Sequence, residues 1–110
     1  MRVAIGWNWP SRLADCSFRF ERYVAGFREL GHAPFLVCAR SALEGFEPEV
    51  DSFPCEELRE LREASFWRRA GADLVVLVTW HAMTGELDGI RASGARVAAF
   101  ADTDGRVPWA

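Results

Sequence analysis

The sequence predicts a single α/β domain, because short apolar segments alternate along the chain with longer segments in which apolar residues recur at helical spacing. Strands that alternate with helices form right-handed β-α-β units, and such units build a parallel sheet with helices on both faces. The chain has 110 residues, half of them hydrophobic, which suits one core. We therefore expect a Rossmann-like, three-layer αβα sandwich with a parallel five-stranded sheet of order 3-2-1-4-5.

The first three elements are predicted to be a strand, a helix and a strand. Residues 2–7 form a short apolar run, which is typical of a strand buried on both faces. In residues 17–30 the apolar side chains lie three or four positions apart, and Gly31 follows as a helix-ending glycine. Residues 33–38 are a second apolar run, entered through Pro34, which a strand tolerates at its start.

The next segment, residues 40–54, is predicted to be less regular. Gly45, Pro48 and Pro54 interrupt any periodicity in this segment. We expect a loop or a short helix, followed by a short strand at residues 50–53 that would be the third of the sheet.

A helix is predicted over residues 55–70, because acidic residues occupy its first turn, Arg68 and Arg69 occupy its last turn and Gly71 follows it. Beyond this helix the alternation is regular again. A β-branched run indicates a central parallel strand, and two further segments complete the pattern. These last elements are a strand at residues 74–80, a helix at residues 86–93 and a strand at residues 96–101.

Composition excludes several classes of function. The formal net charge is −3, and the 13 basic residues are arginines spread along the chain, which argues against a nucleic acid partner. The most apolar run, residues 74–80, is much shorter than the ~20 residues of a membrane-spanning helix, so we expect no membrane span and a cytoplasmic protein. The three cysteines form no C-x-x-C pair, which favours reduced thiols over disulfides or a zinc site.

One edge of the predicted sheet is the expected place for a ligand. The winding of such a sheet reverses between its first and fourth strands, and ligands bind beyond the carboxyl ends of these strands. The segments that follow the first, fourth and fifth strands carry polar and aromatic residues. We therefore expect one crevice surrounded by four candidate binding residues, with no catalytic residue assigned: Trp9, Arg12, His81 and Asp102.

Each candidate also has a purely structural interpretation. Arg12 precedes a predicted helix and suits a phosphate, whereas a solvated loop arginine needs no ligand. His81 suits proton transfer or a hydroxyl, and Trp9 suits stacking on a flat ring, but a solvated histidine and a core tryptophan are the ordinary alternatives. Asp102 and Asp104 form the D-x-D pattern that can hold a metal and a diphosphate, yet turns use aspartates in the same way. We expect no metal and no cofactor.

The order of motifs resembles a known family. In residues 1–38 a strand, a helix, an E-L-G-H turn at residues 29–32 and a second strand follow one another. This arrangement, with the later segments Gly71-Ala72-Asp73 and Ser93-Gly94-Ala95, resembles the N-terminal domain of GT-B glycosyltransferases of the family 4 type. The resemblance implies the acceptor side of the cleft in an enzyme that transfers a sugar from a nucleotide-sugar to an acceptor. Both of these molecules are implied partners.

Several of that family's features are missing from the chain. Residues 8–17 contain no glycine pair, where the family's main chain approaches the donor diphosphate, and Ala101, followed by Asp102, stands where many members have a histidine. The C-terminal domain that holds the nucleotide-sugar is not among the 110 residues. We therefore expect one domain, residues 1–110, from the N-terminal half of a longer two-domain protein. The alternative is a free-standing flavodoxin-like domain that binds a ligand or self-associates, for example as a homo-oligomer, without catalysis.

Overall fold

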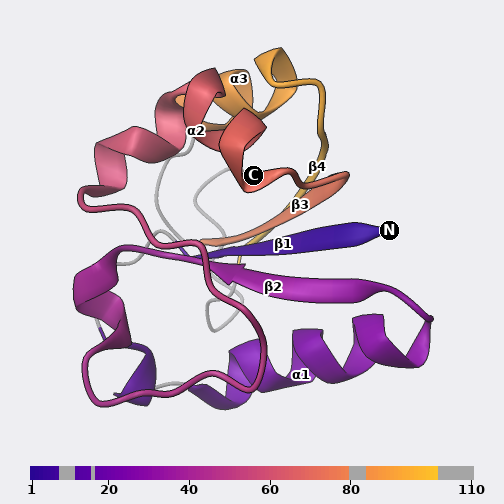
Figure 1. Ribbon diagram of the computed structural model, residues 1–110, viewed down its shortest axis with the longest axis vertical. Coiled ribbons are helices and arrows are strands. Elements are labelled where there is room, and N and C mark those ends of the chain that lie inside the picture. The colour runs from indigo at the N-terminus through magenta and orange to yellow at the C-terminus, as the bar shows by residue number, and fades with distance from the viewer. Residues whose placement is uncertain (8–11, 16, 80–83, 102–110) are drawn as a thin grey trace.

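The computed structural model describes residues 1–7, 12–15, 17–79 and 84–101 of the chain (Figure 1). Among these residues, four strands form one parallel sheet in the order β2-β1-β3-β4. The strands are β1 (Arg2–Trp7), β2 (Ala33–Val37), β3 (Leu74–Thr79) and β4 (Arg96–Ala101). The α/β class, the parallel sheet and the position of the first strand inside it are confirmed.

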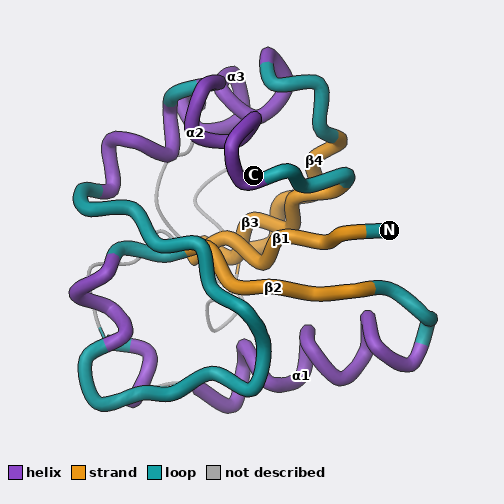
Figure 2. Tube along the Cα trace, in the orientation of Figure 1, coloured by secondary structure: helices purple, strands orange, loops and turns teal. Residues whose placement is uncertain are grey.

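Helices cover both faces of this sheet. Helix α1 (Ser17–Glu29) lies on one face, and α2 (Ala64–Ala70) and α3 (Thr84–Ala92) lie together on the other face (Figure 1). The connections within the described residues contain three 3-10 helices: η1 (Leu13–Asp15), η2 (Arg40–Leu43) and η3 (Leu58–Arg62). Figure 2 shows the strands between the two helical layers. The domain thus has three layers, helix, sheet and helix.

Alternate residues of the central strand point into two separate cores. Val3, Ile5 and Trp7 belong to the core that α1 covers, whereas Ala4 belongs to the core on the side of α2 and α3. All four side chains are almost fully buried. Because the side chains of a strand alternate between its faces, burial on both faces explains why β1 is apolar throughout after Arg2.

The strand expected at residues 50–53 is not formed, so the expected count of five strands and the expected order are wrong. This segment and the residues after it make two isolated parallel bridges along β2 and its extension, Leu36 to Ser52 and Ala39 to Cys55. Pro54 lies between the two bridges. A proline has no N–H to donate and a fixed φ angle, and both properties disfavour a continuous ladder.

The helix expected over residues 55–70 is wrong in extent, because η3 and α2 are separate helices. Glu63 between them is extended, with φ −97° and ψ 125°. The indole Nε1 of Trp67 donates a hydrogen bond to the main-chain oxygen of Leu61 at 2.8 Å, and in a continuous α-helix this oxygen would accept from residue 65. The indole N–H of Trp67 therefore replaces the main-chain N–H that would donate to Leu61 in a continuous helix. Helix α2 ends at Gly71 in the left-handed conformation, as predicted.

The other predicted strands and helices are confirmed, with small shifts at their ends. Trp80, the last residue of the strand expected at residues 74–80, lies outside the described residues. No helix within the described ranges is both long enough and apolar enough to cross a membrane.

Candidate functional site

The strands β1 and β3 lie side by side in the middle of the sheet and end at nearly the same level. Trp7, the last residue of β1, is the register partner of Val78, which is next to last in β3. On its other side β1 pairs with β2. The chain therefore places β2 on one side of β1 and the later strands β3 and β4 on the other side. Parallel α/β sheets bind ligands beyond the carboxyl ends of strands arranged in this way. We call this edge of the sheet, where β1 and β3 end, the carboxyl edge.

Of the four residues expected around the carboxyl edge, Arg12 lies within the described part of the chain. Trp9, His81 and Asp102 lie outside it, so their arrangement around one crevice stays a prediction. Arg12 is exposed, and the next residue, Leu13, is fully buried in the core under α1. The buried leucine therefore anchors the segment that presents the arginine at the surface.

The large aromatic residues of β1 and α2 are packing residues. Trp7 is 1% exposed, and Phe66 and Trp67 are equally buried. The ring of Phe66 meets the ring of Trp67 edge to face with centroids 5.3 Å apart, and it meets the ring of Phe53 at 5.2 Å. These rings stabilise the two cores and are not free to stack on a ligand.

The sequence interpretation missed Glu86, which lies in the first turn of α3. Glu86 is 7% exposed, and its Oε2 atom has no hydrogen-bond partner among the residues that the structure describes. Ile90, one helical turn later, is fully buried in the core shared with α2, so Glu86 belongs to the inner face of α3. A glutamate four positions before a core isoleucine was visible in the sequence. Acidic residues in a first helical turn usually have a simpler explanation, the helix dipole.

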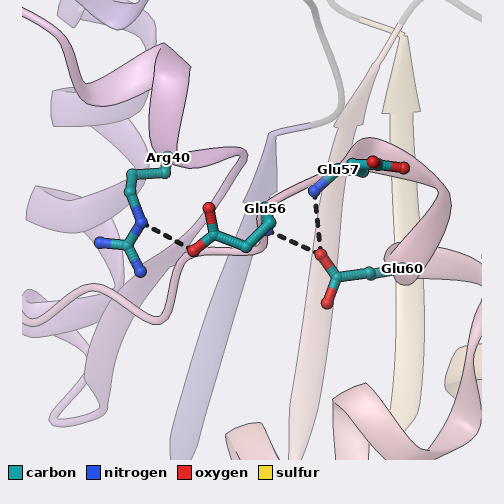
Figure 3. Close-up of polar contacts among 4 residues, drawn as sticks. All are labelled: Arg40, Glu56, Glu57 and Glu60. Atoms are coloured by element: carbon teal, nitrogen blue, oxygen red, sulfur yellow. Dashed lines mark hydrogen bonds and ion pairs between the residues drawn. The ribbon is translucent and has the colours of Figure 1, made fainter.

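A second group of charged residues lies at the start of η3 (Figure 3). Glu60 accepts hydrogen bonds from the N–H groups of Glu57 at 2.9 Å and Glu56 at 2.7 Å, and the bond from Glu57 is the main cause that lowers the pKa of Glu60. Arg40 Nε donates to Glu56 Oε1 at 2.8 Å. Glu57 and Glu60 form a reciprocal capping box. These carboxylates therefore stabilise the start of a helix. Within the described residues no three His, Cys, Asp or Glu side chains are placed to hold a metal.

A groove with a volume of about 160 Å³ lies between α1 and residues 46–49. Phe20 and Phe46 meet edge to face in it, with ring centroids 6.1 Å apart. Arg28, which also lines it, pairs with Glu49 at 3.8 Å and donates to the Glu49 main-chain oxygen at 3.3 Å. Because its arginine is already paired, the groove is best explained as the packing of this loop on α1.

Comparison with known proteins assigns no family to the chain. No protein family matches the sequence, and no similar protein was found among curated proteins or solved structures. The basis for a functional assignment is thus the carboxyl edge itself, with the exposed Arg12 and the buried Glu86.

Proposed function

We propose that the chain is a Rossmann-like domain that forms the acceptor side of the cleft in a nucleotide-sugar-dependent glycosyltransferase. In this proposal the carboxyl edge binds the acceptor, and a second domain holds the donor. The observation that carries the proposal is the register of Trp7 with Val78 in the middle of the parallel sheet, with β2 on the other side of β1. This topology places the ends of β1 and β3 where open α/β sheets bind their ligands.

The resemblance of residues 1–38 to GT-B glycosyltransferases of the family 4 type supports the proposal. The strand, helix, turn and strand of that resemblance follow in the same order in the structure. Gly31 in the turn has a φ of 84°, which glycine adopts without strain. His32 Nδ1 lies 3.2 Å from the amino group of Met1, at the amino ends of the strands, so this histidine has a structural role away from the carboxyl edge.

The proposal gives the candidate residues distinct tasks at the carboxyl edge. Arg12 would bind a phosphate group of the acceptor, because a guanidinium forms strong, charge-assisted hydrogen bonds with phosphate oxygens. His81 would bind an acceptor hydroxyl, Trp9 would stack on the sugar ring, and Asp102 would accept hydrogen bonds from it. None of these tasks needs a metal or an organic cofactor.

The test is a titration of the purified chain, followed through its amide resonances by NMR. The probes are methyl glucoside, methyl mannoside and glucose 1-phosphate, each at millimolar concentration. We expect shifts at the ends of β1 and β3 with all three probes. Arg12→Ala is expected to weaken binding of glucose 1-phosphate about tenfold, the scale of one lost charge-assisted hydrogen bond, and to leave the methyl glycosides unaffected. Arg22→Ala, which removes an exposed arginine of α1, is the matched control.

Three results would overturn the proposal. Shifts that map away from the carboxyl edge would remove its structural basis. Binding of UDP or GDP without any binding of the three sugar probes would indicate a nucleotide-binding domain. Self-association in sedimentation, without sugar binding, would favour the free-standing associating domain.

A further inference from the structure

The first turn of α3 lies at the carboxyl edge. Helix α3 connects β3 to β4, and these two strands are parallel neighbours. A helix in such a β-α-β unit runs antiparallel to its strands. Residues 84–87 therefore lie near the carboxyl ends of β3 and β4, while Ala92 lies near the amino end of β4.

Glu86 points inward from this turn. Gly85 and Gly89 occupy a neighbouring face of α3, where a methyl group placed on Gly85 would lie 3.0 Å from Cδ of Arg62. Glu86 and the fully buried Ile90 share the face turned toward the sheet. The Cα–Cβ bonds of a helix tilt toward its amino end. The Cα–Cβ bond of Glu86 therefore leans from the inner face of α3 toward the carboxyl edge, at the end of the sheet where α3 begins.

A buried carboxyl oxygen without a donor is an unusual feature of a folded protein. Glu86 is 7% exposed, and its Oε2 atom is buried with no hydrogen-bond partner in the described part of the chain. Most buried polar groups are paired, because an unpaired one costs stability. The dipole of α3 favours negative charge in its first turn, but it donates no hydrogen to Oε2. The capacity of Oε2 to accept a hydrogen bond is therefore unused by the described part of the fold.

We propose that Glu86 is a ligand-binding residue of the carboxyl edge and that its Oε2 atom accepts a hydrogen bond from a hydroxyl group of the sugar acceptor. This inference rests on the proposed function and names a contact that the sequence did not predict. A neutral hydroxyl fits better than a cation for two reasons. The described residues provide no set of ligands for a metal, and the Arg62 side chain lies against Gly85, beside Glu86, where it disfavours a positively charged ligand.

The test uses Glu86→Gln, with Asp88→Asn as the matched control. Asp88 belongs to the same helix, and its side chain is exposed, so both variants remove one negative charge from α3. The probes are methyl glucoside and methyl mannoside, titrated by NMR. We expect Glu86→Gln to weaken binding about tenfold, because a neutral amide oxygen is a poorer acceptor than a carboxylate. Asp88→Asn should bind as the wild type does.

A second variant protects the test against a failure to fold. Glu86→Leu replaces the carboxyl group, whose Oε2 atom has no partner among the described residues, with an apolar side chain. We expect this variant to lose detectable glycoside binding while its melting temperature stays the same or rises. A lower melting temperature would mean that the carboxyl group stabilises the fold, and this result would overturn the assignment to a ligand.

The outcomes separate this inference from the proposed function. If the wild type binds the glycosides and Glu86→Gln binds them equally well, the role of Glu86 is wrong and the acceptor-side function stands. If the wild type binds neither glycoside, the proposed function and the role of Glu86 are both overturned.

Discussion

The main-chain oxygen of Arg62 lies too close to the position of a Cβ atom on residue 89 for any side chain to fit there, so Gly89 lets η3 pack directly on α3. The carbonyl carbon of Arg62 and the nitrogen of Glu63 lie 2.6 Å and 3.2 Å from the same position. These atoms belong to the main chain, and they cannot rotate away as a side chain can. Gly89 therefore fixes the place of the helix that carries Glu86.

Gly89→Ala is expected to lower the free energy of unfolding by about 1–3 kcal/mol, the range for overpacked sites. The comparison variant is Gly26→Ala in α1, where an added methyl group meets no heavy atom within 4 Å. Gly26→Ala should raise the free energy of unfolding by about 0.5–1 kcal/mol, because alanine is the better helix former. Urea denaturation followed by circular dichroism measures both. Similar effects of the two substitutions would contradict the close packing of η3 on α3.

Trp67→Phe is expected to lower the free energy of unfolding by about 1–3 kcal/mol, because it leaves the buried main-chain oxygen of Leu61 without a donor. In the wild type the indole proton of Trp67 should exchange with deuterium only when the domain unfolds. Proton NMR in D2O follows this exchange directly. An indole signal that is already lost in the first spectrum would show that the hydrogen bond from Trp67 to Leu61 is absent in solution.

The thiols of Cys38 and Cys55 are expected to be unreactive in the folded protein. Burial, followed by the charge of Cys55, raises the pKa of Cys38 to about 12. Burial, followed by the charge of Glu60, raises the pKa of Cys55 to about 11. Because the thiolate is the reactive form, Ellman's reagent at pH 8 should label neither residue in a Cys16→Ser variant until denaturant is added. Rapid labelling without denaturant would contradict the burial of both side chains.

The same raised pKa values predict that stability falls in alkaline solution. Below the ordinary thiol pKa of about 8.5, both states keep their protons, and the contribution of the two thiols to stability is fully present. Above it the unfolded chain loses protons that the folded chain retains, so the free energy of unfolding declines as pH rises toward 11. The decline should be smaller when Cys38→Ala is added to Cys16→Ser. An identical decline in both variants would mean that ionisable groups other than the Cys38 thiol cause the loss of stability.

The chain on its own is expected to release no nucleoside diphosphate from UDP- or GDP-sugars above the blank. Aligning two substrates across a cleft is worth effective molarities on the order of 10⁵ M or more, and under the proposed function this chain supplies only one side of that cleft. Arg12→Ala and His81→Ala should therefore equal the wild type in a coupled assay. Turnover that either substitution abolishes would make these 110 residues an enzyme by themselves.

The sequence predicts the buried strands well and the irregular parts poorly, for physical reasons. Residues 2–7 and 96–101 match β1 and β4 because a strand covered on both faces is a continuous apolar run. The signals at the ends of the helix expected over residues 55–70 are genuine, but the break at Glu63 depends on a hydrogen bond that forms only in the folded chain. No local pattern contains that information.

The candidate site also has parts that the sequence predicts and parts that depend on packing in the folded chain. Topology alone locates the carboxyl edge, because the order of strands and helices determines where β1 and β3 end. Arg12 could be named in advance, since it is a charged residue in the loop after the first strand. Glu86 could not, because its burial depends on the packing of α3 against the sheet and η3. Trp9, His81 and Asp102 lie outside the described residues and stay predictions.

The irregular segment beside β2 limits how copies of this domain can join. Leu36 donates its N–H to Asp51 and accepts from Phe53, and the Cys38 oxygen accepts from Cys55, at 2.8 to 2.9 Å. Free groups on a sheet edge are a template for strands from other molecules, as in fibrils. Here the outward groups of Leu36 and the oxygen of Cys38 are already bonded to the segment around Pro54, and this segment does not form a regular strand that could pair further. Growth of an intermolecular sheet is thereby blocked at the β2 end.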